Sequence, residues 1–212
     1  MCKKKNIYSG NVNIYHRASI LDPSQVTGWY EVNGSNFDVE TIIDFDVPNC
    51  NGGGIYLGGF HGVLVSRDSG TNFSFFNSGL PAGTEIYAFG NSSYTNTIYA
   101  GSDLKGLYRL QVYTNNCNPG VNYWAKVNTG MRDDAFITSI VFSNEGKNIF
   151  VGSYYDGVYV SRDYGVTWKE FNEGMFLANP TMKTVYSLAI SEKLNKIYVA
   201  NGDGYVYKRN MK

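Results

Sequence analysis

The chain has few charged residues, and its positive and negative charges balance. Of its 212 residues, 18 are Lys or Arg and 18 are Asp or Glu, so the net charge is zero and charged side chains make up only 17%. This argues against a protein that binds nucleic acid or an anionic membrane through bulk positive charge. It also argues against a coiled coil and against an acidic disordered chain.

Long hydrophobic runs and cysteine clusters are missing as well. Because no run of 18 apolar residues occurs, we expect no transmembrane helix. The start, Met1–Lys5, lacks the apolar segment of a signal peptide. Cys2 before three lysines fits either a lipid anchor or an ordinary polar tail. The spacing of Cys2, Cys50 and Cys117 supports neither a zinc site nor a disulfide framework, and a single Cys50–Cys117 bridge stays open. We expect no metal and no cofactor.

What the chain has instead is 24 glycines, 18 tyrosines and an internal repeat. Glycine and aromatic residues in such numbers favour short strands joined by tight turns. An apolar segment that ends in a small residue recurs about every 48 positions. Its five copies are Ile7–Gly10, Ile55–Gly58, Ile98–Gly101, Ile149–Gly152 and Ile197–Ala200.

Each copy is part of a longer unit. An apolar strand precedes the last four copies, a turn and a second strand follow all five, and an aromatic segment that ends in Asn follows the first four. These segments are Trp29–Asn33, Phe73–Asn77, Trp124–Asn128 and Trp168–Asn172. Four antiparallel strands in this length are typical of a propeller blade. No segment shows a convincing helical period.

The sequence therefore predicts an all-β protein, a β-propeller of five four-stranded antiparallel blades in a single domain, residues 1–212. The predicted blades are a partial one over 6–36, complete ones over 41–80, 85–131 and 137–175, and a partial one over 184–209. In one alternative the N-terminal strand Trp29–Asn33 closes a ring of four blades. In another the chain is a fragment, or a homo-oligomer in which a second chain completes the ring.

Two turns share a specific pattern, S-x-D-x-G-x-[ST]-[WF]. The first copy has Ser66, Asp68, Gly70 and Phe73, with Asn72 at the Ser/Thr position; the second has Ser161, Asp163, Gly165, Thr167 and Trp168. The pattern resembles the Asp-box, or BNR repeat, of the sialidase, sortilin and xyloglucanase-like propellers. We expect each Asp to accept hydrogen bonds within its own turn; catalysis or metal binding is the alternative. The resemblance implies that these turns lie far from any active centre.

The resemblance also implies that the opposite ends of the blades bind the ligand. The candidate binding residues there are Phe60, His61, Asp103, Tyr154, Tyr155, Asp156 and Asp203. Aromatic faces stack on sugar rings, and carboxylates accept hydrogen bonds from hydroxyl groups. The three Asp residues fall at nearly equivalent positions and would form an acidic arc. The alternative is that Asp beside Gly serves only the turn.

Six arginines are too few for the arginine cluster of a sialidase. A glycoside hydrolase needs two carboxylates across a cleft, for which Asp133 or Asp134 together with Asp38 or Asp103 are the candidates, but the related enzymes are longer. The sequence therefore predicts a non-catalytic binding or scaffolding protein with a glycan or protein partner, in the cell envelope or outside the cell. The alternatives are a glycosidase-like propeller and a self-assembling structural module.

Overall fold

The computed structural model describes residues 7–10, 14–17, 30–31, 37–45, 54–68, 70–92, 94–112, 123–143, 146–175 and 183–212. This part of the chain contains strands and turns but no helix, which confirms the predicted all-β class. It therefore contains no helix long and apolar enough to cross a membrane. Cys2, Cys50, Cys117 and Trp29 lie outside the described residues, and so do the predicted anchor and disulfide.

The strands form five antiparallel sheets that follow one another along the chain. Sheet 1 contains β1 (Ile7–Gly10), β2 (Ile14–Arg17) and β3 (Tyr30–Glu31). Sheet 2 contains β4 (Val39–Phe45), β5 (Gly54–Gly59), β6 (Gly62–Ser66) and β7 (Ser74–Phe75). Sheet 3 contains β8 (Ile86–Ser92), β9 (Thr97–Ser102), β10 (Leu107–Gln111) and β11 (Ala125–Lys126). Sheet 4 contains β12 (Ile137–Ser143), β13 (Asn148–Ser153), β14 (Gly157–Ser161) and β15 (Lys169–Glu170). Sheet 5 contains β16 (Val185–Ser191), β17 (Lys196–Asn201) and β18 (Val206–Asn210).

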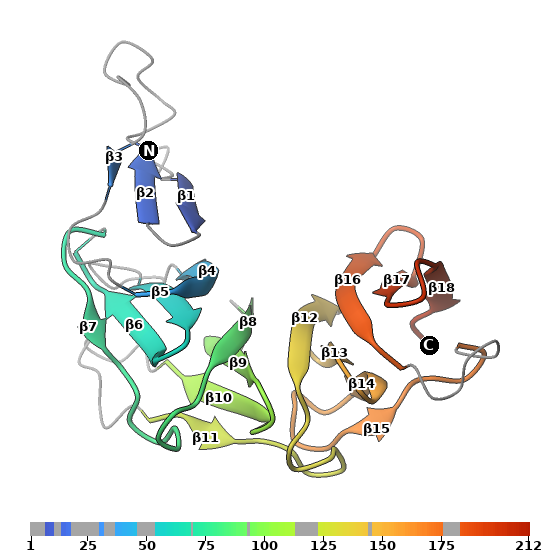
Figure 1. The fold of residues 1–212 in the computed structure, drawn as a ribbon. Helices are drawn as coiled ribbons and strands as arrows, with labels where there is room; N and C mark the ends of the chain where they lie inside the picture. The colour runs from blue at the N-terminus through green and yellow to red at the C-terminus, as the bar shows by residue number, and fades with distance from the viewer. Residues whose placement is uncertain are drawn as a thin grey trace.

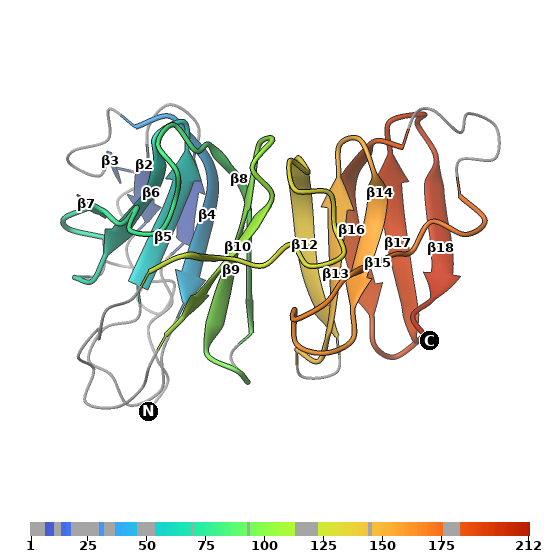
Figure 2. The same cartoon turned by 90° about the horizontal axis from the view of Figure 1, so that it is seen from below.

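The sheets pack face to face, and their inner strands β4, β8, β12 and β16 lie side by side along an arc (Figures 1 and 2). The middle strands are buried on both faces, which is why their sequences are almost continuously apolar. Glycine permits this close approach. A Cβ atom at Gly101 would come within 2.4 Å of Ile137 on the next sheet, and Gly58 and Gly152 are confined in the same way.

The predicted closed propeller is wrong, because the five sheets form an open arc. Among the described residues no strand of sheet 5 packs against sheet 1, and the two lie at opposite ends of the arc in Figure 1. The four-bladed closure is wrong as well, since β3 pairs with β2 rather than with β18. The repeat determines how one sheet stacks on the next. Ring closure depends on the small rotation between neighbouring sheets, which the period of the sequence does not specify.

Candidate functional site

The turns that carry the predicted ligand residues all lie at one end of the sheets, which we call the loop end. In sheets 3, 4 and 5 a backbone hydrogen bond joins this turn to the segment before the inner strand of the same sheet. The bonds run from Asp103 N–H to Glu85 O (3.2 Å), from Tyr154 N–H to Phe136 O (2.9 Å) and from Gly202 N–H to Thr184 O (2.9 Å). Turn residues and inner-strand residues therefore form one continuous surface at the loop end.

A β-bulge at the start of each inner strand adds side chains to this surface. The pairing of β4, β8, β12 and β16 shifts register by one residue near the loop end. The residues left unpaired are Glu40, Tyr87, Thr138 and Tyr186. A bulge re-aims the side chain it carries, and bulges are frequent beside functional sites. Here two of the four re-aimed residues are tyrosines.

These tyrosines join an aromatic cluster that spans sheets 3 to 5 and consists of Tyr87, Phe136, Tyr154, Tyr155 and Tyr186. The ring centroids of Tyr87 and Phe136 lie 4.8 Å apart, and those of Phe136 and Tyr154 lie 5.4 Å apart in a stacked pair. Tyr154 also contacts Tyr155 at 4.9 Å and Tyr186 at 6.2 Å. Tyr155 and Tyr186 are 50% and 57% exposed, so the cluster presents two rings to solvent.

Arg132 lies beside the aromatic cluster and binds two carboxylates there. Its guanidinium forms ion pairs with Asp134 (2.7 Å) and Asp156 (3.0 Å) and lies 5.7 Å from the centroid of the Tyr155 ring. Asp156 also accepts a hydrogen bond from the hydroxyl of Ser153 at 2.9 Å. The Arg132 guanidinium thus contacts two carboxylates and the Tyr155 ring at the loop end.

The other end of the aromatic cluster is acidic. The Tyr87 hydroxyl donates a hydrogen bond to Glu85 at 3.1 Å. Burial, this hydrogen bond, and the negative charges of Glu85, Glu40 and Asp103 raise the pKa of Tyr87 to about 12. The Tyr87 hydroxyl therefore stays protonated and remains a hydrogen-bond donor at physiological pH.

The structure brings only some of the predicted residues together. Tyr154, Tyr155 and Asp156 lie in the aromatic cluster or beside it, whereas Phe60 and His61 lie on sheet 2, where His61 contacts Phe37 at 6.1 Å between ring centroids. The pairing of the flanking strands places the three predicted Asp residues at three different positions of their turns, so they are not equivalent. Asp103 accepts from the Glu85 N–H, and Asp203 accepts from Asn201.

The sequence analysis missed Tyr87, Phe136 and Tyr186 as site residues. The signal that could have found the bulged tyrosines is a repeated triplet of an apolar residue, a variable residue and a small residue. It occurs as Val39-Glu40-Thr41, Ile86-Tyr87-Ala88, Ile137-Thr138-Ser139 and Val185-Tyr186-Ser187. Its middle position is the bulge.

The two Asp-box-like turns lie at the opposite end of the sheets. Asp68 accepts hydrogen bonds from the Asn72 backbone (2.9 Å), the Asn72 side chain (2.7 Å) and Ser66 (2.8 Å), which lower its pKa to about 2. Partial burial would raise the pKa of Asp163, but hydrogen bonds from Thr167 and Ser161 outweigh it and lower that pKa to about 2 as well. Both carboxylates thus serve their own turns.

The candidate catalytic carboxylates Asp133 and Asp134 are each paired with a cation. Asp133 pairs with Lys126 at 2.7 Å, and Asp134 pairs with Arg132 at 2.7 Å. Both side chains are mostly exposed, so each acid has its own cation and open contact with solvent.

No known family matches the chain, and no curated protein matches it significantly. Among solved structures, the extracellular domain of a putative one component system, BT4673 from B. thetaiotaomicron, is similar, with a TM-score of 0.68 and 12% identity over 96% of this chain and 25% of that one. PorZ, described as an essential bacterial surface component of the type-IX secretion system of Porphyromonas gingivalis, has a TM-score of 0.67 and 18% identity over 95% of this chain and 30% of that one. These likenesses show a shared fold alone, and this chain spans under a third of either protein.

Proposed function

We propose that the chain is a non-catalytic binding module that recognises a glycan through the aromatic cluster at its loop end. The observation that supports this is the pair of exposed rings, Tyr155 and Tyr186, on either side of Tyr154, with Arg132 and Asp156 next to them. A tyrosine offers an apolar face for a sugar ring and a polar hydroxyl at its edge. The guanidinium and the carboxylate can donate to and accept from sugar hydroxyls.

The charge arrangement favours a neutral, hydroxyl-rich ligand over an anion. Arg132 is already paired with two carboxylates, and three further acids surround Tyr87. An anionic ligand would have to compete with these groups for a single guanidinium. A ligand that makes hydrogen bonds without bringing a charge of its own fits the site better.

The surroundings of Asp133 and Asp134 support the non-catalytic part of the proposal. A glycoside hydrolase places its acid and its base or nucleophile about 5 to 9.5 Å apart on opposite sides of the scissile bond. Here Asp133 pairs with Lys126 of β11 and Asp134 pairs with Arg132 of its own loop. A hydrolase activity at these residues is the competing outcome of the experiment below.

We further propose that the protein works in the cell envelope or outside the cell. The support is that the similar solved structures are an extracellular domain and a bacterial surface component. The relationship to Asp-box repeats is likewise a proposal, supported by the same Ser–Asp hydrogen bonds in both turns (2.8 and 2.7 Å).

A glycan array followed by calorimetry on the best ligand tests the proposed function. We expect Tyr155→Ala and Tyr186→Ala each to weaken binding roughly tenfold, because each removes a stacking face. Tyr94→Ala is the matched control: Tyr94 is 63% exposed but lies in the turn between β8 and β9, at the opposite end of the sheet. It should leave the affinity unchanged.

The same protein should release no reducing sugar from the glycans it binds. Turnover that is lost in Asp133→Asn or Asp134→Asn would replace the proposal with a hydrolase. A wild-type protein that retains no glycan, or one whose affinity falls equally in all three Tyr→Ala variants, would contradict the proposed site.

A further inference from the structure

The turns at the loop end of sheets 3 and 4 have the same length. The strand registers pair Leu107 with Gly101 in sheet 3 and Val158 with Gly152 in sheet 4. Each turn therefore runs from a buried serine to a glycine of positive φ. The residues between them are Asp103, Leu104 and Lys105 in sheet 3, and Tyr154, Tyr155 and Asp156 in sheet 4. Leu104 thus occupies the position that Tyr155 has in the next sheet.

Leu104 is an unexpected residue at the tip of its turn. It is 52% exposed, close to the 50% of Tyr155. Its φ is 44°, in the left-handed region that favours glycine and strains a bulky residue such as leucine. An exposed leucine alone is ordinary, but an exposed leucine in a strained backbone position adds nothing to the stability of the turn. Because strained residues are concentrated at ligand sites, Leu104 is a candidate ligand contact.

The Leu104 turn is joined to the segment that carries the bulged Tyr87. The Asp103 N–H donates to Glu85 O at 3.2 Å, and the Glu85 N–H donates to the Asp103 carboxylate at 3.3 Å. The Tyr87 hydroxyl in turn donates to the Glu85 carboxylate at 3.1 Å. At the loop end, sheet 3 therefore combines an exposed apolar residue, an aromatic ring and hydrogen-bonding groups, as the corresponding turn of sheet 4 does.

The aromatic rings at the loop end form a row rather than a compact group. Successive ring centroids lie 4.8 Å apart from Tyr87 to Phe136, 5.4 Å from Phe136 to Tyr154 and 6.2 Å from Tyr154 to Tyr186. Tyr87 belongs to sheet 3, the next two rings to sheet 4 and Tyr186 to sheet 5. The row therefore follows the order of the sheets along the arc (Figure 2).

A ligand of a single sugar unit would cover only part of this surface. The two exposed rings of the proposed glycan site, Tyr155 and Tyr186, both contact Tyr154. Leu104 and Tyr87 lie on the neighbouring sheet. Since packed sheets lie about 10 Å apart, which exceeds the width of one sugar ring, a single unit cannot contact both pairs of residues. A chain of sugar units can contact both.

We propose that the glycan bound at the loop end is a neutral, unbranched polysaccharide chain that lies along sheets 3, 4 and 5. Tyr155 and Tyr186 contact one section of the chain, and Leu104 and Tyr87 contact the next section. The apolar side chains pack on the faces of the sugar rings, while hydroxyl and carboxylate groups of the same turns form hydrogen bonds at the ring edges. The inference rests on the proposed glycan-binding function and adds the class of glycan.

Calorimetry with neutral, unbranched oligosaccharides of increasing length tests the inference. The probes are cello-, xylo-, manno- and malto-oligosaccharides, each series running from the disaccharide to the hexasaccharide. In at least one series we expect the wild type to bind the hexasaccharide at least roughly tenfold more tightly than the disaccharide, because the longer chain also buries Leu104 and Tyr87.

The matched variants are Leu104→Ala and Leu194→Ala. Leu194 is 56% exposed but lies in the turn between β16 and β17, at the opposite end of sheet 5. We expect Leu104→Ala to lose most of the gain in affinity with chain length and to bind the disaccharide as the wild type does. Leu194→Ala should bind every probe as the wild type does.

A second variant, Leu104→Gly, separates a ligand contact from a folding defect. Glycine adopts the positive φ at this position without strain, so the variant should melt at no lower temperature than the wild type. It should nevertheless lose the dependence of affinity on chain length. A purely structural role of Leu104 would instead lower the melting temperature and leave that dependence unchanged.

The outcomes distinguish this inference from the proposed function. If the wild type binds disaccharide and hexasaccharide equally tightly, and Tyr155→Ala weakens both, the inference is overturned and the proposed function stands. A chain-length dependence that survives in Leu104→Gly, or binding confined to branched or charged glycans, overturns it as well. A protein that binds no glycan at all contradicts the proposed function and the inference together.

Discussion

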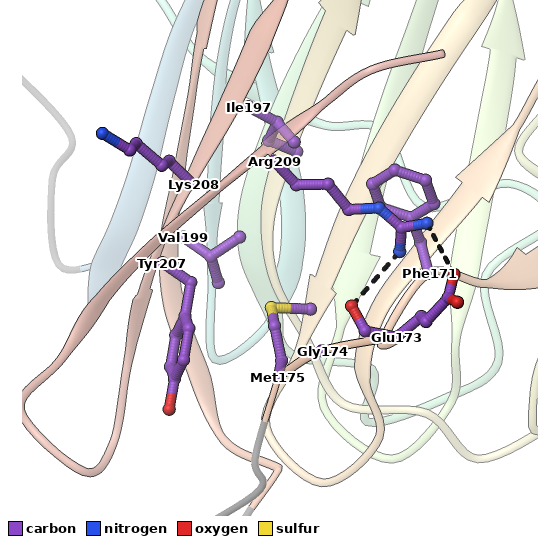
Figure 3. Close-up of a pocket in the computed structure, with 9 residues that line it drawn as sticks. All are labelled: Phe171, Glu173, Gly174, Met175, Ile197, Val199, Tyr207, Lys208 and Arg209. Atoms are coloured by element: carbon purple, nitrogen blue, oxygen red, sulfur yellow. Dashed lines mark hydrogen bonds and ion pairs between the residues drawn. The ribbon is translucent and has the colours of Figure 1, made fainter.

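The junction of sheets 4 and 5 is lined by residues equivalent to those at the junctions of sheets 2 and 3 and of sheets 3 and 4. The side chain that lies in the junction differs. Trp124 and Trp168 each lie directly before the outer strand of one sheet and are buried against the turn of the sheet before it. Sheet 5 has no outer strand in the described residues. There the Arg209 guanidinium lies 4.0 Å from the centroid of the Phe171 ring of sheet 4 (Figure 3). The comparison indicates that the two-residue outer strand chiefly positions the tryptophan before it, and that this tryptophan connects its sheet to the preceding one.

The largest expected effect is on the free energy of unfolding. It should distinguish the junction of sheets 2 and 3, which holds Trp124, from the junction of sheets 4 and 5, where Arg209 lies. Trp124→Ala should lower the free energy of unfolding by about 3 to 5 kcal/mol, because it empties a buried site. Arg209→Ala should lower it by less than about 1 kcal/mol, since it removes a surface ion pair and a partly exposed ring contact. Urea denaturation followed by circular dichroism measures both. Equal losses would mean that the two junctions are not distinguished by their contents.

A second comparison uses the glycines beneath the tryptophan position. Both have positive φ, 89° at Gly79 and 81° at Gly174, so alanine costs about 1 to 2 kcal/mol of backbone strain at either position. Gly79→Ala also forces a Cβ atom against the Trp124 carbonyl, for which we expect a further 1 to 3 kcal/mol, roughly. Thermal melts of the two variants give the difference. If Gly174→Ala were as unstable as Gly79→Ala, the space beside Gly174 would be occupied in solution, which would contradict this comparison.

The pH dependence of stability should report on the two Asp-box-like turns, which follow β6 in sheet 2 and β14 in sheet 4. Their folded pKa values, about 2, lie below the ordinary value of 3.8, so the stabilisation they give is fully present above about pH 4. It is lost as the pH falls towards 2. We expect the double variant Asp68→Asn and Asp163→Asn to melt at a lower temperature at pH 7 and to lose less between pH 4 and pH 2. Parallel melting profiles of the variant and the wild type would contradict this.

The smallest effects concern two buried tyrosines of sheet 3. The Tyr99 hydroxyl donates to Tyr164 O of the next sheet at 2.9 Å, so Tyr99→Phe should cost about 1 kcal/mol. The Tyr108 hydroxyl is buried and has no hydrogen-bond partner in the described part of the chain, so Tyr108→Phe should change stability by less than about 0.5 kcal/mol or increase it slightly. Reversal of this order in urea denaturation would contradict the hydrogen-bond assignment.

Local features of the fold could be predicted because the repeat encodes them. The segment Ile98–Gly101 lies within β9, and Trp124 and Trp168 occupy matching sites, as a stack of similar sheets requires. The closed ring could not be predicted correctly. Closure depends on the rotation accumulated over all the sheets, and no single residue records that rotation.

The candidate site was predictable only where its residues are neighbours in sequence. Tyr154, Tyr155 and Asp156 share one turn and were found together. Tyr87 and Tyr186 come from different sheets and reach the aromatic cluster through a one-residue bulge. A bulge shifts the alternation of buried and exposed positions, so a reading that assumes strict alternation misses the residue it carries.

The central claim is that the junction of sheets 4 and 5 resembles the two preceding junctions but holds no tryptophan among the described residues, and the exchange rate of one amide tests it most directly. Leu107 and Val158 donate their N–H groups to Asn side chains at 2.8 and 2.7 Å, and Val206 occupies the same position in sheet 5. In hydrogen exchange followed by NMR, we predict that the Val206 amide of the free protein exchanges at least roughly a hundredfold faster than the other two. Equal protection of all three amides would show that β18 already has an outer strand, and would contradict the account.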